Sequence, residues 1–155
     1  MANTYTQLHI HAVFSPKYRD AVIHSSWEDE LYRYLTGAVQ AYDHKMLQIN
    51  GMPDHIHMLF GMRPTQGLSD LMKTIKEESS RWINRQGFVP GTFRWQSGFG
   101  AFSVEKVSIP RIARYIERQK QHHAHQQLKF REEYRRILER HGVEYDERYI
   151  FRELV

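Results

Sequence analysis

The sequence contains no cysteine among its 155 residues. Disulfide bonds and thiolate metal sites are therefore excluded, and the composition is typical of proteins from a reducing compartment. The first residues lack the basic segment and apolar run of a secretory signal. No apolar run approaches the length of about 20 residues that spans a bilayer. We therefore expect a soluble, cytoplasmic protein with no membrane partner.

Low-complexity segments and internal repeats are also missing from the sequence. With 41% hydrophobic residues, the chain is long enough to bury a core, and we expect a single domain over residues 1–155. The formal net charge is +4, but between Arg111 and Arg140 nine Lys or Arg outnumber four Glu. A basic C-terminal third favours a polyanionic partner, although a solvated helix face would have the same composition.

The segment from Asp54 to Phe60 has the composition of a buried strand, because it follows a turn-like Gly-Met-Pro-Asp sequence and is rich in branched and aromatic residues. Side chains alternate between the faces of a strand, so His55 and His57 share a face. Two such imidazoles can share one cation, or each can be satisfied by neighbouring polar groups. His9 and His11 form a second pair with the same spacing.

The pattern of apolar residues predicts the order of the elements. In chain order we expect a strand over 6–14, a helix from about 25 to 42, strands over 45–50 and 54–60, a helix over 68–84, a strand over 101–104, and helices over 109–121 and 126–140. Ser25 and Ser108 are the expected caps of two helices. The order predicts an α+β, ferredoxin-like (split βαβ) antiparallel sheet, with helices on one face plus C-terminal helices. The first and third strands are central neighbours in that topology.

The predicted helix over 109–121 places Tyr115, Gln119 and His122 on one face, at positions i, i+4 and i+7. A tyrosine hydroxyl near a divalent metal is a credible nucleophile toward phosphate, because the metal polarises the phosphate and stabilises the departing oxygen. Gln119 can add a neutral oxygen ligand, and His122 is its rival as a ligand for softer metals. A buried structural role for Tyr115 is the alternative.

Together these motifs resemble those of the single-tyrosine HUH transposases, the small TnpA proteins of bacterial insertion sequences that move as single-stranded DNA. His55-Ile56-His57 resembles their His-hydrophobic-His motif, and the segment from Tyr115 to Gln119 resembles their Tyr-x-x-x-Gln helix. Shorter similarities lie at 16–19, 79–82, 95–99 and 122–123, so the resemblance covers about residues 5–140 and leaves a tail over 143–155. Arg118 stands where many relatives have Asn.

The resemblance implies that His55, His57 and Gln119 bind Mg²⁺ or Mn²⁺. Tyr115 would attack a DNA phosphate, form a 5′-phosphotyrosine intermediate and release a 3′-hydroxyl. The protein would be a homodimer in the cytoplasm of a bacterium or archaeon, and its tyrosine helix could complete the site of the same or the other subunit. Its substrate would be single-stranded DNA with hairpins near the ends of the element.

Basic and aromatic residues outside these motifs are candidate DNA contacts, because cations neutralise phosphates and exposed rings stack on unpaired bases. The candidates are Lys17, Arg19, Lys73, Lys76, Arg81, Trp95, Arg111 and Arg118. We expect the aromatic residues of the Gly-rich segment 87–100 to be exposed. His9, His11 and His122 are expected to support the ligands, since ligand-orienting neighbours are common around metal sites.

Three other functions remain open from the sequence. A non-catalytic ferredoxin-like nucleic-acid-binding module would share the fold, but it would carry exposed aromatics on its sheet. A related HUH nicking enzyme, or a domesticated relative that processes repeated hairpins, would use the same chemistry. A histidine-ligated hydrolase that uses metal-bound water would not need Tyr115.

Overall fold

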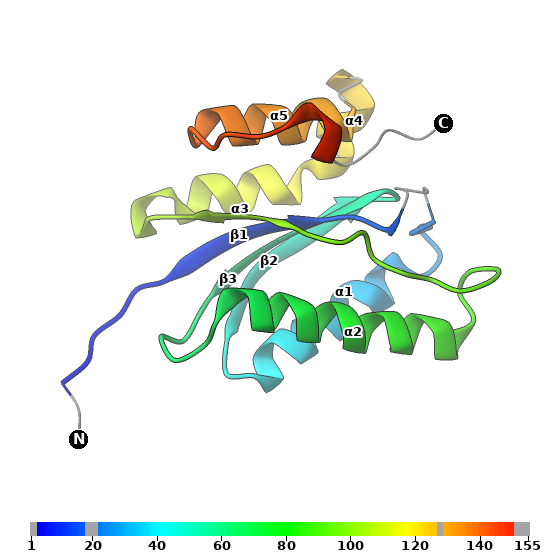
Figure 1. Cartoon of the computed structure of the whole chain (residues 1–155), viewed down its shortest axis with the longest axis horizontal. Helices are drawn as coiled ribbons and strands as arrows, with labels where there is room; N and C mark the ends of the chain where they lie inside the picture. The colour runs from blue at the N-terminus through cyan, green and yellow to red at the C-terminus, as the bar shows by residue number, and fades with distance from the viewer. Residues whose placement is uncertain (1–2, 18–21, 127–128, 151–155) are drawn as a thin grey trace.

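A four-stranded antiparallel sheet lies at the centre of the computed structural model, which describes residues 3–17, 22–126 and 129–150 (Figure 1). Its strands are β1 (His9–Phe14), β2 (Lys45–Met52), β3 (His55–Gly61) and β4 (Gly100–Ser103), in the order β2-β3-β1-β4. The first and third strands are central neighbours, with Val13 opposite His57. The predicted α+β fold and split βαβ order are confirmed.

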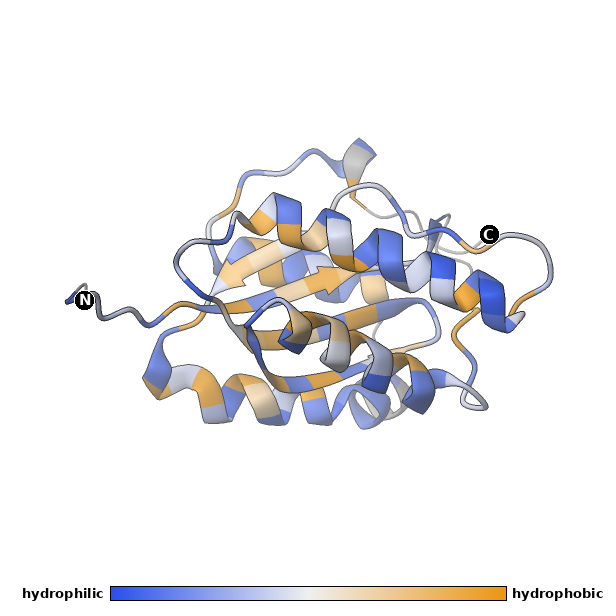
Figure 2. Cartoon of the chain, turned by 90° about the horizontal axis from the view of Figure 1, so that it is seen from below, coloured by the Kyte–Doolittle hydropathy of each residue, from blue (hydrophilic) through white to orange (hydrophobic). Residues whose placement is uncertain are grey.

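One face of the sheet carries the larger hydrophobic core. Ala12 and Phe14 of β1 and Ile56, Met58 and Phe60 of β3 point into it, as their alternation predicts. Helices α1 (Glu28–Ala41) and α2 (Leu68–Gln86) cover this face (Figure 1). Figure 2 shows hydrophobic colouring along the strands and mixed colouring along the helices that cover them, as expected for amphipathic helices.

Three further helices cover the opposite face, so both faces of the sheet are buried (Figure 1). They are α3 (Ile109–Glu117), α4 (Gln119–Gln126) and α5 (Phe130–Arg140), and two short 3-10 helices, η2 (Lys106–Ser108) and η3 (Glu147–Tyr149), flank them. Phe130 and Ile137 of α5 pack with Val13 and Phe102 of the sheet. His11, His55 and His57, which face this side, are therefore enclosed between the sheet and the C-terminal helices.

The helices differ from the predictions in three places. The expected helix over 109–121 is broken at Arg118, whose backbone leaves helical geometry (ψ 17°), so α3 and α4 are separate. The expected helix over 126–140 begins only at Phe130. The predicted side-chain caps are wrong: α1 begins after Trp27 without a side-chain cap, and Ser108 makes no capping bond to α3.

The segment between α2 and β4 is more buried than predicted. Phe93 and Trp95 belong to the larger core, and the Trp95 indole donates a 2.8 Å hydrogen bond to Ser79 Oγ. The expectation that these rings are exposed is therefore wrong, and Trp95 is unavailable for stacking on a base. In the described part of the tail, Ile150 is buried against α5. Among the described residues, no helix has the length and apolar character needed to cross a membrane.

Candidate metal centre and nucleophile

Two histidines of β3 form the base of the candidate site. His55 and His57 are fully buried on the sheet face that α3, α4 and α5 cover. Their ring centroids are 5.0 Å apart, as their spacing of two residues on one strand requires. The antiparallel pairing of Met52 with His55 and of Asn50 with His57 fixes this register. The strand therefore presents both rings to the C-terminal helices.

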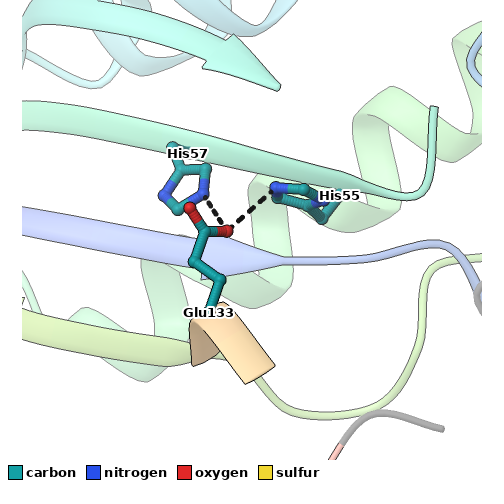
Figure 3. A group of neighbouring side chains, drawn as sticks. All are labelled: His55, His57 and Glu133. Carbon is teal, nitrogen blue, oxygen red and sulfur yellow. Dashed lines mark hydrogen bonds and ion pairs between the residues drawn. The ribbon is translucent and has the colours of Figure 1, made fainter. Parts of the chain in front are cut away.

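A carboxylate from α5 lies between the two rings. Figure 3 shows the side chain of Glu133 pointing from the start of α5 toward His55 and His57 on β3. Glu133 Oε1 lies 3.2 Å from Nε2 of His55 and 3.2 Å from Nε2 of His57. The side chain of Glu133 is only 1% exposed, so three potential ligand atoms converge in a dry site.

Residues of α3 and α4 complete the same cluster. Gln119 Oε1 lies 3.0 Å from His55 Nε2, and its amide nitrogen donates a 2.8 Å hydrogen bond to Glu133 Oε2. The Tyr115 hydroxyl donates a hydrogen bond to the same Oε2 atom. His123 Nε2 lies 3.2 Å from both Gln119 Oε1 and Glu133 Oε1. One oxygen of Glu133 thus faces the histidines, and the other faces Tyr115.

The outer nitrogens of the two β3 histidines have their own partners. His55 Nδ1 is 2.8 Å from Asp54 Oδ1, and His57 Nδ1 shares a 2.8 Å hydrogen bond with His11 Nε2. Partners of this kind fix the orientation of a ligand ring and raise its basicity. His11 and Asp54 therefore direct the Nε2 atoms of both rings toward Glu133. His11, which the sequence predicts to support the ligands, contacts His57 in this way.

The charge state of the cluster follows from burial and hydrogen bonding. Burial disfavours a charged His55, but the hydrogen bonds to Asp54 and Glu133 outweigh it and raise the His55 pKa to about 9. Burial lowers the pKa of His57. Burial, reinforced by the charge of Glu133, raises the pKa of the Tyr115 hydroxyl. Burial opposes ionisation of Glu133, yet its interactions with the histidines keep its pKa well below the usual range.

The donor set fits a divalent cation. Three atoms approach one another closely: His55 Nε2, Gln119 Oε1 and Glu133 Oε1. Two of them, the amide oxygen and the carboxylate oxygen, can only accept hydrogen bonds. Without a cation, the single proton on His55 Nε2 must serve both oxygens while Nδ1 faces Asp54, whereas a cation would accept a lone pair from each of the three atoms. Imidazole suits Mn²⁺ and later metals, and carboxylate and amide oxygens suit Mg²⁺ and Mn²⁺. His55, His57, Gln119 and Glu133 are thus chemically suited to hold such an ion.

Two of the supporting histidines lie outside this centre. His9 is partly buried and packs beside Gly61. His122 packs edge-on against Tyr115 with ring centroids 5.2 Å apart, whereas His123 reaches Gln119 and Glu133. After the break at Arg118 the helix restarts at Gln119, so His123, four positions later, shares a face with Gln119. The sequence motifs predict His122 and not His123 as a neighbour of the ligands, but His123 is the residue that contacts Gln119 and Glu133.

The candidate DNA contacts do not converge on one surface. Lys73 and Lys76 line a hollow beside α2, and Lys76 donates a 2.8 Å hydrogen bond to the carbonyl of Gln96. Lys17 lines a second hollow, which shares Arg94 with the first. Arg81 is exposed on α2, Arg111 lines a pocket beside Tyr115, and Arg118 is exposed after α3. Arg19 lies outside the described residues. Among the described candidates, Arg111 lines the same pocket as Tyr115.

Glu133 is not among the residues that the sequence motifs predicted, although a signal for it exists. The buried residues of α5 are Phe130, Glu133, Tyr134, Ile137 and Leu138. An acidic residue on the apolar face of an amphipathic helix needs a buried partner, because a buried unpaired charge is unfavourable. This pattern identifies Glu133 as unusual, but it does not say which element supplies the partner.

Comparisons with known proteins identify the family of this chain. The family model described as IS200-like transposase matches residues 4–119. The ISDra2 transposase TnpA of Deinococcus radiodurans is 26% identical over 118 residues, which cover 73% of this chain and 84% of that protein. The transposase for insertion sequence element IS200 of Salmonella typhimurium is 27% identical over 124 residues, which cover 77% of this chain and 81% of that protein.

Two solved structures share the fold. A candidate transposase from Deinococcus radiodurans R1 superposes with a TM-score of 0.63 at 24% identity, covering 77% of this chain and 95% of that one. A REP-associated tyrosine transposase bound to a REP hairpin gives a TM-score of 0.60 at 12% identity, covering 80% of this chain and 73% of that one.

The match to the family model extends from the segment before β1 through both β3 histidines and Tyr115 to Gln119. His123 and Glu133 lie beyond the matched residues. Because the model spans most of the sequence, this chain belongs to the family of IS200-like transposases, which are DNA-cleaving enzymes.

Proposed function

We propose that this transposase is a metal-dependent enzyme that cuts and rejoins single-stranded DNA through Tyr115. The observation that supports it most is the shared carboxylate. Glu133 accepts a hydrogen bond from the Tyr115 hydroxyl on one oxygen and faces His55 and His57 with the other. A nucleophile and a cation site would therefore lie on either side of one buried group.

The cation site would consist of His55, His57 and Gln119, with Glu133 as a further ligand, and would take Mg²⁺ or Mn²⁺. When bound, the cation would polarise the DNA phosphate and stabilise charge on its departing oxygen. Asp54 and His11 would orient the two imidazoles from behind. The α3, α4 and α5 layer would keep bulk water away from the ligand atoms, since both histidines are fully buried.

Tyr115 would supply the nucleophile. Its raised pKa means that the hydroxyl keeps its proton at neutral pH, so attack requires an acceptor for that proton. Glu133 Oε2 is the atom that already accepts this hydrogen bond. As the proton passes to Glu133, the bond between the Tyr115 oxygen and phosphorus forms and the P–O3′ bond breaks. The departing oxygen takes up a proton from water and becomes a free 3′-hydroxyl, which can later reverse the step.

The DNA substrate is proposed to be single-stranded, with a hairpin near each end of the element. The REP-associated tyrosine transposase that shares the fold is bound to a REP hairpin, which supports this choice. We further propose that the protein works as a homodimer in the cytoplasm. Tyr115 bonds Glu133 of its own chain, and this contact favours a site in which each subunit uses its own tyrosine.

An adduct assay tests the tyrosine mechanism. The protein is incubated with labelled single-stranded hairpin DNA of varied flanking sequence and Mn²⁺ or Mg²⁺, and adducts that survive denaturation are separated on a gel. Wild-type protein should form an adduct that chelator abolishes and Tyr115→Phe lacks. Tyr34→Phe is a matched control, because Tyr34 lies on α1 and stacks on Trp82.

Two results would contradict the mechanism. The first is an adduct that persists in Tyr115→Phe, and the second is a wild-type protein that forms none on any flanking sequence. Cleavage that persists without an adduct in Tyr115→Phe would instead indicate hydrolysis by water.

A further inference from the structure

A basic pocket lies next to Tyr115, outside the cluster of histidines. It has a volume of about 380 Å³ and lies between the end of β4, η2, the first turns of α3 and the end of α5. This volume lies within the range of small-ligand sites, about 300–1,000 Å³. Tyr115 and His11 line it, whereas His55, His57 and Glu133 do not. Tyr115 therefore separates the pocket from the candidate metal ligands.

Two arginines give the pocket its charge. Arg111 of α3 and Arg140 of α5 line it, and within the described part of the chain neither guanidinium makes a hydrogen bond or ion pair. Glu105 is the single carboxylate of the lining, so the pocket carries a net positive charge. The charge of Arg140 acts on Tyr115, and the charges of both arginines act on His141. Arg140 is thus close enough to influence the nucleophile, and both cations are close enough to influence His141 at the rim.

The rest of the lining suits a nucleoside. Val104, Ile112 and Ile137 supply apolar surface. His141 stacks on Phe102 with ring centroids 4.7 Å apart, which holds its ring at the edge of the pocket. A combination of apolar walls and two guanidiniums fits a sugar and base attached to a phosphate, because guanidinium groups bind phosphate oxygens with paired donors.

We propose that this pocket binds the nucleotide that follows the scissile phosphate, with Arg111 and Arg140 holding the next phosphate of the same strand. The inference rests on the proposed tyrosine mechanism. In an in-line displacement the attacking and departing oxygens lie opposite each other across phosphorus. The departing 3′ oxygen would lie toward the metal ligands. The strand that stays attached to Tyr115 through its 5′ phosphate can then leave the centre through the pocket, which holds it until rejoining.

The test uses a strand that mimics the attached product. The probe is hexathymidylate with a 5′ phosphate and a 3′ fluorescein, and its binding is followed by fluorescence anisotropy in chelator at several salt concentrations. Arg111→Gln and Arg140→Gln should each weaken binding about tenfold, which is the lower end of the range expected for losing a hydrogen bond to a charged group. Each should also reduce the slope of log affinity against log salt by about 0.7, the value for one phosphate contact on a single strand.

Arg33→Gln is the matched control, because Arg33 is an exposed arginine of α1 on the other side of the sheet. It should leave the salt slope unchanged, and thermal melting should confirm that all three variants are folded. Four results would each overturn the assignment. The salt slope could be that of wild type in both pocket variants, or Arg33→Gln could lose as much affinity as they do. The loss of affinity could be confined to one pocket arginine, or the wild-type protein could fail to bind the probe. No covalent bond forms in chelator, so this result is independent of the adduct assay.

Discussion

The buried carboxylate of Glu133 gives the most direct test of the centre. Glu133→Gln keeps the shape of the side chain but removes the charge that faces His55 and His57. A protonated His55, which is fully buried, would then keep only Asp54 as a charged partner. The substitution should therefore destabilise the metal-free protein and also weaken metal binding.

The size of the destabilisation follows from the His55 pKa. Breaking a buried ion pair costs about 3–5 kcal/mol when the remaining charge stays in place. His55 can instead lose its proton, and with a pKa of about 9 this costs about 3 kcal/mol at pH 7. We therefore expect Glu133→Gln to lower the free energy of unfolding in chelator by about 3 kcal/mol. For a chain of this length that loss lowers the melting temperature by about 6–12 °C.

The loss of stability in Glu133→Gln should depend on pH in one direction. The folded-state pKa of His55 lies above the ordinary value of 6.5, so protonation of His55 stabilises the fold fully below that value. This contribution is lost as the pH rises through about 9. The difference between wild-type protein and Glu133→Gln should therefore shrink as the pH is raised from 7 to beyond the His55 pKa.

Thermal unfolding followed by circular dichroism in chelator measures both quantities. Glu132→Gln is the control, because Glu132 is exposed and pairs with Arg136 one helical turn away; it should change stability by less than about 0.5 kcal/mol. The reasoning is wrong if Glu133→Gln melts like wild type at pH 7, or if its deficit does not change with pH.

Three further predictions follow from the same geometry. Asp54→Asn should lower Mn²⁺ affinity about 10–100-fold in calorimetric titration, because it weakens the partner that orients His55; unchanged affinity would contradict this. Gly51→Ala should lower the free energy of unfolding by about 1–3 kcal/mol, because its Cβ would lie 2.2 Å from the backbone oxygen of His55. Gly37→Ala, with open space around it, should not destabilise the protein. Mixed dimers of Tyr115→Phe and His55→Ala chains should form no adduct if each chain uses its own tyrosine, whereas adduct formation would indicate exchange of the tyrosine helix.

The sheet and the residues of the family motif could be predicted from local patterns. Alternation of apolar residues placed β1 and β3, and the split βαβ order made them neighbours. A spacing of two on β3 put His55 and His57 on one face without any tertiary information. Helical spacing then brought Tyr115 and Gln119 together even across the break at Arg118. Each of these predictions depends on the regular spacing at which a strand or helix backbone points its side chains to one face.

The remaining parts of the centre depend on packing between distant segments. Glu133 reaches the histidines only because α5 packs across β1 and β4 through residues such as Phe130. No periodic pattern specifies which face of the sheet an appended helix will cover. The burial of Trp95 escaped prediction for a similar reason, because the indole N–H donates a hydrogen bond to Ser79 on a distant element, α2. Local patterns locate side chains on an element, but the choice of partner comes from the assembled core.

The short connection between β2 and β3 determines how the protein tolerates insertions. Met52 pairs directly with His55, so Pro53 and Asp54 alone form the turn. One extra residue that shifted β3 by a single position would exchange its two faces. Both imidazoles would then enter the apolar core, and Ile56 and Met58 would take their places. Changes in loop length should therefore be selected against at this hairpin, which makes it a poor site for peptide tags or domain insertions.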